Sequence, residues 1–127
     1  MTTRAGLQPY AFVLAVLDLP KTSDYFETAL GFHLEWEDGT NWRTLSRDGV
    51  RVMLGHCPDA VPPAAIGDHS YFGYWLIDDV DALHVEISQR GAIILQPPTD
   101  RPWGRREMAL ATPDGHRIMI GQQIGNG

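Results

Sequence analysis

One short phrase occurs twice in this chain, and the repetition constrains the fold more than any other feature. Residues 48–54 read Asp-Gly-Val-Arg-Val-Met-Leu and residues 114–120 read Asp-Gly-His-Arg-Ile-Met-Ile, an offset of 114 − 48 = 66 residues. The chain has only 127 residues. A duplication in so short a chain indicates two copies of one supersecondary unit that share a core, since neither copy could bury its apolar face alone.

Each copy is predicted to contain a strand, a helix and three further strands. The first helix starts at Asp18 and stops at Gly31, and Asp78 and Gly91 have the same separation (31 − 18 = 91 − 78 = 13). The strands are expected at 10–17, 32–37, 41–47 and 50–56, and again at 71–77, 92–96, 105–112 and 116–122. The β-α-β-β-β order predicts an α+β fold, in which the two repeats form a curved mixed sheet with helices outside and a trough inside.

The two copies are expected to form one domain over residues 8–124. The first repeat covers about 8–57, a linker rich in proline and alanine covers 58–68, and the second repeat covers about 69–124. A hydrophobic content of 43% is enough for a packed core. A loop at Gln96–Pro102, with three prolines, is predicted to be the largest length difference between the copies.

Charge and cysteine usage exclude several kinds of partner. Ten basic against 16 acidic residues give a net charge of −6, which argues against binding to nucleic acid or to an anionic membrane surface. The one cysteine, Cys57, excludes an intrachain disulfide. The longest apolar run, Phe12–Leu17, is too short to span a bilayer, and no signal peptide is visible. We therefore expect a cytoplasmic protein.

The Asp48-Gly49 turn predicts how the strands on either side of it pair. A two-residue hairpin there pairs Leu45 with Val52. Because side chains alternate across a strand, Leu45, Val52 and Leu54 face the helix. The opposite face then carries a mixed set of side chains, namely Trp42, Thr44, Ser46, Arg51 and Met53.

The second hairpin is predicted to have a three-residue turn at 113–115. This turn pairs Leu110 with Ile118 and Met108 with Ile120, again an apolar set. The opposite face carries Arg105, Glu107, Ala109, Arg117 and Met119, and also Trp103 if the strand extends back to it. Aromatic side chains with a few charges suit a largely apolar pocket with a few orienting polar groups.

Several motifs together resemble one known family. They are Val16-Leu17-Asp18-Leu19, Tyr25-Phe26, Leu30-Gly31-Phe32, Ile77-Asp78-Asp79-Val80, Trp103-Gly104 and Pro113-Asp114-Gly115. With the paired β-α-β-β-β units, they resemble the vicinal-oxygen-chelate superfamily, which includes glyoxalase I, extradiol dioxygenases, fosfomycin-resistance enzymes and bleomycin-resistance proteins. The resemblance covers about residues 8–124 and implies the glyoxalase/bleomycin-resistance fold, which hosts several functions.

The resemblance also implies where the metalloenzymes of the family place their four ligands. The corresponding positions here hold Ala11, Met53, Phe72 (or Tyr71) and Met119. None is a His, Gln or Glu, and thioether sulfur suits Cu(I) rather than the metals these enzymes use. His69 lies near the third position but outside the strand register. We therefore predict no metal, no cofactor and no catalytic residue, with a metal-dependent glyoxalase-like lyase/isomerase or dioxygenase with relocated ligands as the alternative.

Within the superfamily the chain looks most like the bleomycin-resistance proteins, which bind the drug without chemistry in clefts at a homodimer interface. The resemblance implies antibiotic resistance by sequestration of a planar or cationic small molecule, such as a bleomycin-like antibiotic, in a homodimer. Aromatic planes suit such ligands. The residues expected to line the cleft are Trp36, Trp42, Thr44, Phe72, Tyr74, Trp103, Arg105 and Glu107.

Structural explanations compete with these assignments. Trp103 would seal the open end of the sheet, and Trp42 would pack in a dimer interface. Arg105 and Glu107 would form an ion pair on a partly solvated surface, which is the commoner arrangement. By parity, Trp75 is predicted to pack against the helix. A third function stays open, an accessory module that has no pocket and acts through its dimer surface.

Overall fold

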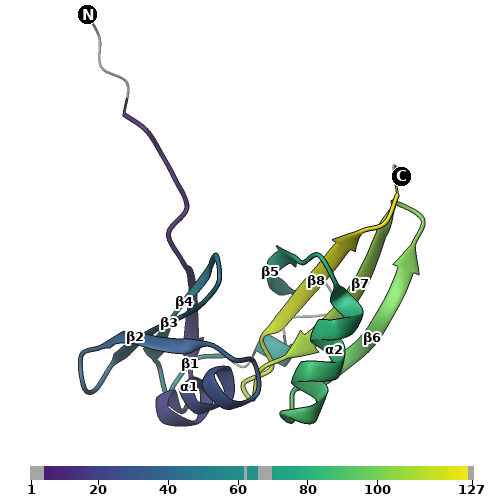
Figure 1. Cartoon of the computed structure of the whole chain (residues 1–127). Helices are drawn as coiled ribbons and strands as arrows, with labels where there is room; N and C mark the ends of the chain where they lie inside the picture. Colours follow the sequence, from purple (N-terminus) through teal and green to yellow (C-terminus); the bar gives the residue numbers. More distant parts are fainter. Residues whose placement is uncertain (1–4, 62, 66–69, 126–127) are drawn as a thin grey trace, which may run out of the picture.

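The computed structural model describes residues 5–61, 63–65 and 70–125, and the chain forms two modules with one order of elements (Figure 1). The first module contains β1 (Phe12–Val16), α1 (Leu19–Thr28), β2 (His33–Glu37), β3 (Trp42–Arg47) and β4 (Val50–His56). The second contains β5 (Tyr71–Leu76), α2 (Val80–Gln89), β6 (Ile93–Arg101), β7 (Arg105–Ala111) and β8 (Arg117–Gln123). A short 3-10 turn, η1 (Pro63–Ala65), lies between them. The duplicated β-α-β-β-β order is confirmed.

Both helices begin at an aspartate and are followed by a glycine. The Asp18 side chain accepts a hydrogen bond from the Lys21 backbone N–H at the start of α1, and Asp79 accepts one from the Ala82 N–H at the start of α2. Gly31 and Gly91 follow with φ of 74° and 90°, which a glycine adopts without strain. Each helix thus has an aspartate at its start and a glycine after its end, but α2 is capped by Asp79 and not by Asp78, from which the equal spacing was counted.

Each module forms its own four-stranded mixed sheet. The strand orders are β1-β4-β3-β2 and β5-β8-β7-β6, with β1 parallel to β4 and β5 parallel to β8. The predicted hairpin registers are confirmed, since Leu45 pairs with Val52 and Leu110 with Ile118. The face assignments made from parity therefore hold for both hairpins.

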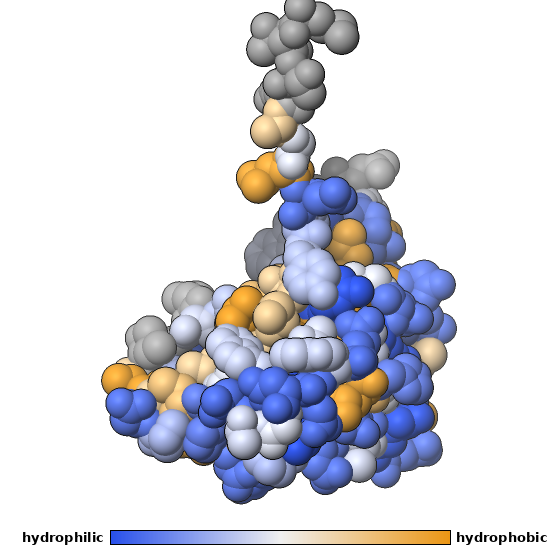
Figure 2. Space-filling view, turned by 90° about the vertical axis from the view of Figure 1, so that its left-hand side faces the viewer, coloured by the Kyte–Doolittle hydropathy of each residue, from blue (hydrophilic) through white to orange (hydrophobic). Residues whose placement is uncertain are grey.

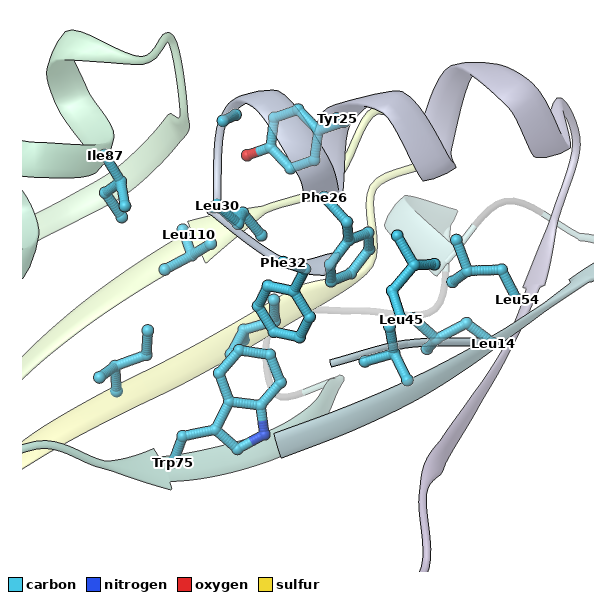
Figure 3. Packing of buried hydrophobic residues seen from close by; sticks show 14 of the residues in the cluster. Leu14, Tyr25, Phe26, Leu30, Phe32, Leu45, Leu54, Trp75, Ile87 and Leu110 are labelled. Carbon is cyan, nitrogen blue, oxygen red and sulfur yellow. The ribbon is translucent and has the colours of Figure 1, made fainter. Parts of the chain in front are cut away.

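The helix-covered faces of the two sheets meet in one core (Figure 3). Phe26 of α1 packs edge-on against Phe32, with ring centroids 5.1 Å apart, and Phe32 in turn contacts Trp75 of β5 at 5.9 Å. Trp75 thus packs in the core, as predicted. Leu45 from the first sheet and Leu110 from the second are fully buried in the same cluster. The two copies share a core, as the duplication predicted.

Polar contacts from the second module anchor the start of the first. The turn between β7 and β8 brings the Asp114 carboxylate to the Leu17 backbone N–H (2.9 Å) and to the Thr22 hydroxyl (3.3 Å). The buried Tyr25 hydroxyl donates to the Ala111 carbonyl oxygen (2.6 Å) and accepts from the Ile93 N–H (3.0 Å).

The equivalent hairpin of the first module reaches the second in return. Arg47, at the end of β3, donates from both terminal nitrogens to the two Glu86 carboxylate oxygens of α2, each at 2.9 Å. Arg47 also donates to the Leu30 carbonyl oxygen at 2.8 Å. Each copy of the repeated hairpin therefore contacts the opposite module.

One predicted element is wrong. The Gln96–Pro102 segment was expected to be a loop, but β6 continues through Pro97 and Pro98 to Arg101. Prolines are tolerated because β6 is an edge strand whose pairing with β7 shifts register between Ile94 and Thr99. The extension brings Thr99 opposite Glu107, close to the candidate site.

Parts of other predictions lie outside the described residues, namely positions 62 and 66–68 of the linker, His69, and the last two residues of the chain. No helix within the described residues is both long enough and apolar enough to cross a membrane.

Candidate functional site

The sheet face opposite α1 is an open surface rich in aromatic side chains. Trp36 pairs with Thr44, and Thr44 pairs with Met53, so that these three side chains form one row across the sheet. Thr44 is buried, whereas Trp36 and Trp42 are exposed. Viewed from the side of the first module, pale and orange atoms gather in the centre, with mostly blue atoms to the right and below (Figure 2). The face offers flat apolar area with a hydroxyl at its centre.

A glycine holds Trp42 flat on this face. Trp42 pairs with Gly55 of β4, and a Cβ atom added to Gly55 would lie 2.8 Å from two carbons of the indole ring. The ring therefore occupies the space that any other residue at position 55 would need. The glycine allows the tryptophan to lie across the strand.

An ion pair that the sequence did not point to borders the same face. The Arg51 Nε donates to Glu35 Oε1 at 2.8 Å, and the Arg51 guanidinium lies 4.5 Å above the Tyr10 ring centroid. The hydrogen bond from Arg51 lowers the pKa of Glu35, so that this carboxylate stays ionised. Glu35 lies at the register shift in β2 between Leu34 and Trp36.

The second module carries a cavity of about 350 Å³ on the corresponding face. It is lined by Tyr74, Trp103, Arg105, Glu107 and Gln123. Four of these five residues were predicted to bind a ligand. The fifth, Gln123, was missed because its position was expected to lie beyond the last strand, whereas β8 extends to it and pairs it with Arg105.

A buried carboxylate organises this cavity. Glu107 is 5% exposed, and its Oε2 accepts hydrogen bonds from the Tyr74 hydroxyl (2.6 Å) and from the Trp103 indole Nε1 (3.0 Å). The other oxygen, Oε1, lies 3.8 Å from Arg101 Nε. Burial, and then the hydrogen bond to Glu107, raise the pKa of the Tyr74 hydroxyl, so that Tyr74 remains a donor.

Arg105 completes the network around Tyr74. Its Nε donates to the Gln123 side-chain oxygen at 2.7 Å, and its Nη1 donates to the Tyr74 hydroxyl oxygen at 3.2 Å. The guanidinium carbon lies 5.5 Å from the Tyr74 ring centroid. Trp103, in the turn between β6 and β7, is held by its bond to Glu107 and keeps 52% of its surface exposed. An exposed indole with a fixed orientation can stack on a planar ligand.

The open sheet faces of the two modules share a backbone arrangement but carry different side chains. Gly121 lies 121 − 55 = 66 residues after Gly55, and a Cβ atom there would lie 2.8 Å from Cζ of Tyr74. Gly55 pairs with Trp42, whereas Gly121 pairs with Glu107. Where the first module has an indole, the second has a buried carboxylate.

The structure divides the predicted residues into two groups and leaves one residue, Phe72, outside both. Tyr74, Trp103, Arg105 and Glu107 meet in the cavity, while Trp36, Trp42 and Thr44 lie on the first module's face.

Phe72 joins neither group. The pairing of β5 with β8 shifts register between Tyr71 and Gly73, so Phe72 turns to the core. There it contacts the rings of Phe12, Trp75 and His116, with centroids about 6 Å apart. The resemblance placed Phe72 in the cleft, but the irregular strand turns this side chain to the core instead.

A second cavity, of about 300 Å³, lies between the modules. Its lining is mostly apolar and comes from the shared core, with Arg47 and Asp48 at its edge. Arg47 already uses its terminal nitrogens on Glu86 and Leu30. Binding sites combine apolar area with converging polar groups, and these converge on the sheet face of the second module instead.

The described residues contain no group of three or more His, Cys, Asp or Glu side chains that could hold a metal ion. Met53 and Met119, at two of the positions that correspond to family ligands, lie on the open faces of the two sheets. Their thioethers are poor ligands for the hard and borderline metals that such enzymes use.

Two β-α-β-β-β modules with a shared core and open sheet faces define a class of paired-module proteins. The chain belongs to the Glyoxalase/Bleomycin resistance protein/Dioxygenase superfamily, whose profile matches residues 8–120. Comparison with curated protein sequences finds no match.

Solved structures share the fold at low identity. A bleomycin resistance determinant encoded on the transposon Tn5 has 23% identity and a TM-score of 0.75, over 92% of this chain and 98% of that one. TnmS3, an antibiotic binding protein from Streptomyces sp. CB03234, has 24% identity and a TM-score of 0.70, over 94% and 99%. A superfamily member from Alicyclobacillus acidocaldarius has 16% identity and a TM-score of 0.78, over 98% and 97%. At these identities the likeness shows the fold.

Proposed function

We propose that this protein binds a planar aromatic small molecule in the cytoplasm and sequesters it without chemical change, as an antibiotic-binding protein. The observation that carries the proposal is the exposed Trp103, which Glu107 holds at the edge of a cavity lined by polar and aromatic side chains. The resistance and antibiotic-binding functions named for two structural neighbours support this class. A bleomycin-like glycopeptide is the first ligand to test.

The complete site, in this proposal, forms between two copies of the chain. The cavity is lined by residues of the second module alone, and the exposed indoles of Trp36 and Trp42 lie on the other sheet. Large exposed apolar area on a sheet face marks an interaction surface. A twofold dimer would place the first-module face of each copy against the cavity of its partner and form two equivalent clefts.

Fluorescence titration tests ligand binding directly. Bleomycin and planar aromatic compounds are titrated into the protein while tryptophan emission is followed. A saturable change at micromolar ligand is expected, weakened in Trp103→Ala and Trp42→Ala. Trp36→Phe is the matched control, because it keeps an aromatic surface on the same face. Absence of any saturable change with all of these ligands would refute the proposal.

A mixing experiment tests the shared cleft. Trp42→Ala and Trp103→Ala each damage every cleft of their own homodimer. Random exchange between them makes half of the dimers mixed, and each mixed dimer has one intact cleft. About a quarter of all clefts should therefore regain wild-type affinity. If the complete site lies within one chain, mixing restores none.

The two alternatives make different predictions. A metal-dependent lyase, isomerase or dioxygenase requires a stoichiometric metal, so elemental analysis of protein grown in metal-supplemented medium would detect it. A module that acts only through its dimer surface would dimerise but leave tryptophan emission unchanged with every ligand. No specific feature of the described residues favours either alternative over binding.

A further inference from the structure

We infer that the second-module cavity selects planar ligands that carry an anionic oxygen, such as a carboxylate or a phenolate, and that Arg105 makes this selection. The inference rests on the proposed function and names the class of ligand within it. It differs from the expectation of a cationic ligand, which the three-dimensional arrangement of charges does not support.

The one carboxylate in the cavity lining already has partners within the protein. Glu107 Oε2 accepts from both Tyr74 and Trp103, and Oε1 lies 3.8 Å from Arg101 Nε. A ligand cation at Oε2 would have to displace one of these donors, and a cation at Oε1 would lie beside the positive charge of Arg101. Buried charges are costly when they lose their partners, so Glu107 is a poor receptor for a cation.

Arg105 is in the opposite situation. Its hydrogen-bond partners, the Gln123 amide and the Tyr74 hydroxyl, are both neutral. Among the described residues, no carboxylate lies within ion-pair distance of Arg105. By contrast, five other arginines each lie within 4.0 Å of a carboxylate: Arg47, Arg51, Arg90, Arg101 and Arg106.

The local charge balance points the same way. Glu107 contributes one negative charge, whereas Arg101 and Arg105 contribute two positive charges, which leaves a net of +1 around the cavity. The whole protein has a net charge of −6. A cationic group without a counter-charge, at a cavity in an acidic protein, attracts an anionic group to that point.

The geometry allows an aromatic acid to contact both groups. Trp103 and Arg105 line the same cavity, and hydrogen bonds orient both side chains. A guanidinium carries five N–H donors, and Arg105 uses its Nε and one Nη1 donor within the protein. Its remaining donors can bind a carboxylate or phenolate while the ligand ring stacks on the Trp103 indole.

Three matched probes test the inference: naphthalene-2-carboxylate, naphthalene-2-carboxamide and 2-(aminomethyl)naphthalene in its ammonium form. They share one ring system and differ mainly in charge. Calorimetric titration of the full-length protein at low ionic strength should show the carboxylate binding about tenfold or more tightly than the carboxamide, with the ammonium weakest. Added salt should reduce this preference, because it screens the charges.

Two variants then test whether Arg105 causes the preference for the carboxylate over the carboxamide. Arg105→Gln should lose the preference and bind the carboxylate and the carboxamide about equally. Arg106→Gln is the matched control, since Arg106 pairs with Asp81 and Asp100 and is absent from the cavity lining. It should keep the preference. Circular dichroism of each variant shows that the fold is intact, and the wild-type comparison stands without any variant.

The possible failures are distinct. Equal binding of carboxylate and carboxamide to the wild type, tightest binding of the ammonium, or an undiminished preference in Arg105→Gln would each overturn the inference. Failure of all three probes while bleomycin still binds would also overturn it and leave the proposed function standing. If neither the probes nor any planar antibiotic binds, the proposed function itself fails.

Discussion

The contact between Gly121 and Tyr74 allows a quantitative test of how the candidate site is built. Gly121 lies in β8 and does not have a positive φ, so alanine fits its backbone. An added Cβ atom would, however, lie 2.8 Å from Cζ and 3.1 Å from Cε1 of Tyr74, with the hydroxyl oxygen closer still. In Gly121→Ala the ring must therefore lift away from the strand.

The cost follows from the bonds that this movement breaks. The Tyr74 hydroxyl bonds to the Glu107 carboxylate at 2.6 Å, and a hydrogen bond to a charged group contributes about 1.5–3 kcal/mol to the free energy of unfolding. Replacing a glycine by alanine at a compatible backbone position returns about 0.4–1 kcal/mol. Gly121→Ala should therefore destabilise the protein by about 0.5–2.5 kcal/mol.

Repeating Gly121→Ala in a Tyr74→Ala protein isolates the contribution of the contact between these two residues. In Tyr74→Ala the obstructing ring is absent, so Gly121→Ala should stabilise the protein by about 0.4–1 kcal/mol. Urea unfolding followed by far-UV circular dichroism measures both differences, and the coupling between the two positions should be about 1.5–3 kcal/mol. If Gly121→Ala has the same effect in both backgrounds, the account of the ring resting on Gly121 is incorrect.

Three further predictions follow from the contacts described above. Gly55→Ala should tilt the Trp42 ring, because the added Cβ atom would lie 2.8 Å from two indole carbons. Tryptophan emission should shift and planar ligands should bind more weakly. In a Trp42→Leu protein, adding Gly55→Ala should have no effect on either measurement. Tyr25→Phe should lower the free energy of unfolding by about 1–3 kcal/mol, measured in urea, because the Ala111 carbonyl and Ile93 N–H lose their partner; an unchanged midpoint would contradict this. The hydrogen bonds from Arg47 lower the pKa of Glu86 in the folded protein. The ion pair should therefore stabilise the protein fully above the ordinary glutamate pKa of about 4.3, and this stabilisation should be lost as the pH falls through the lowered pKa of Glu86. Glu86→Gln should flatten this part of the acid unfolding profile.

The fold could be predicted largely because turn chemistry determines strand register. The Asp48-Gly49 turn allows only one pairing of the strands around it, and the structure confirms the resulting pair of Leu45 with Val52. The duplication then extended the same reasoning to the second hairpin. Regular pairing made parity a reliable guide to which side chains face the helix.

The prediction failed where the strands are irregular. Phe72 lies at a register shift in β5 and packs against the core, although it was expected to line the cleft. The prolines at 97 and 98 suggested a loop, because the sequence does not show that β6 is an edge strand. These irregularities depend on contacts with neighbouring strands, which no single segment of sequence contains.

The sequence predicted which residues line the candidate site but not how these residues contact one another. Tyr74, Trp103, Arg105 and Glu107 were expected to share a face, and they meet in one cavity. The sequence did not indicate that Glu107 would be buried with one oxygen already accepting two hydrogen bonds, nor that Arg101 would lie beside the other oxygen. Hydrogen-bond partners are decided by side-chain positions from three strands and a turn, which the residue types alone do not show.

The divergence of the two copies gives the duplication a functional meaning. Both copies keep a glycine in the last strand, Gly55 and Gly121, and both use it to lay an aromatic ring against the sheet. Opposite these glycines, however, one copy has Trp42 and the other has Glu107. In the proposed dimer an apolar aromatic wall from one chain would face a polar cavity from its partner. Two identical modules would line both sides of the cleft with the same side chains. The divergence would therefore let one cleft stack on the ring of a ligand and also orient the polar group of that ligand.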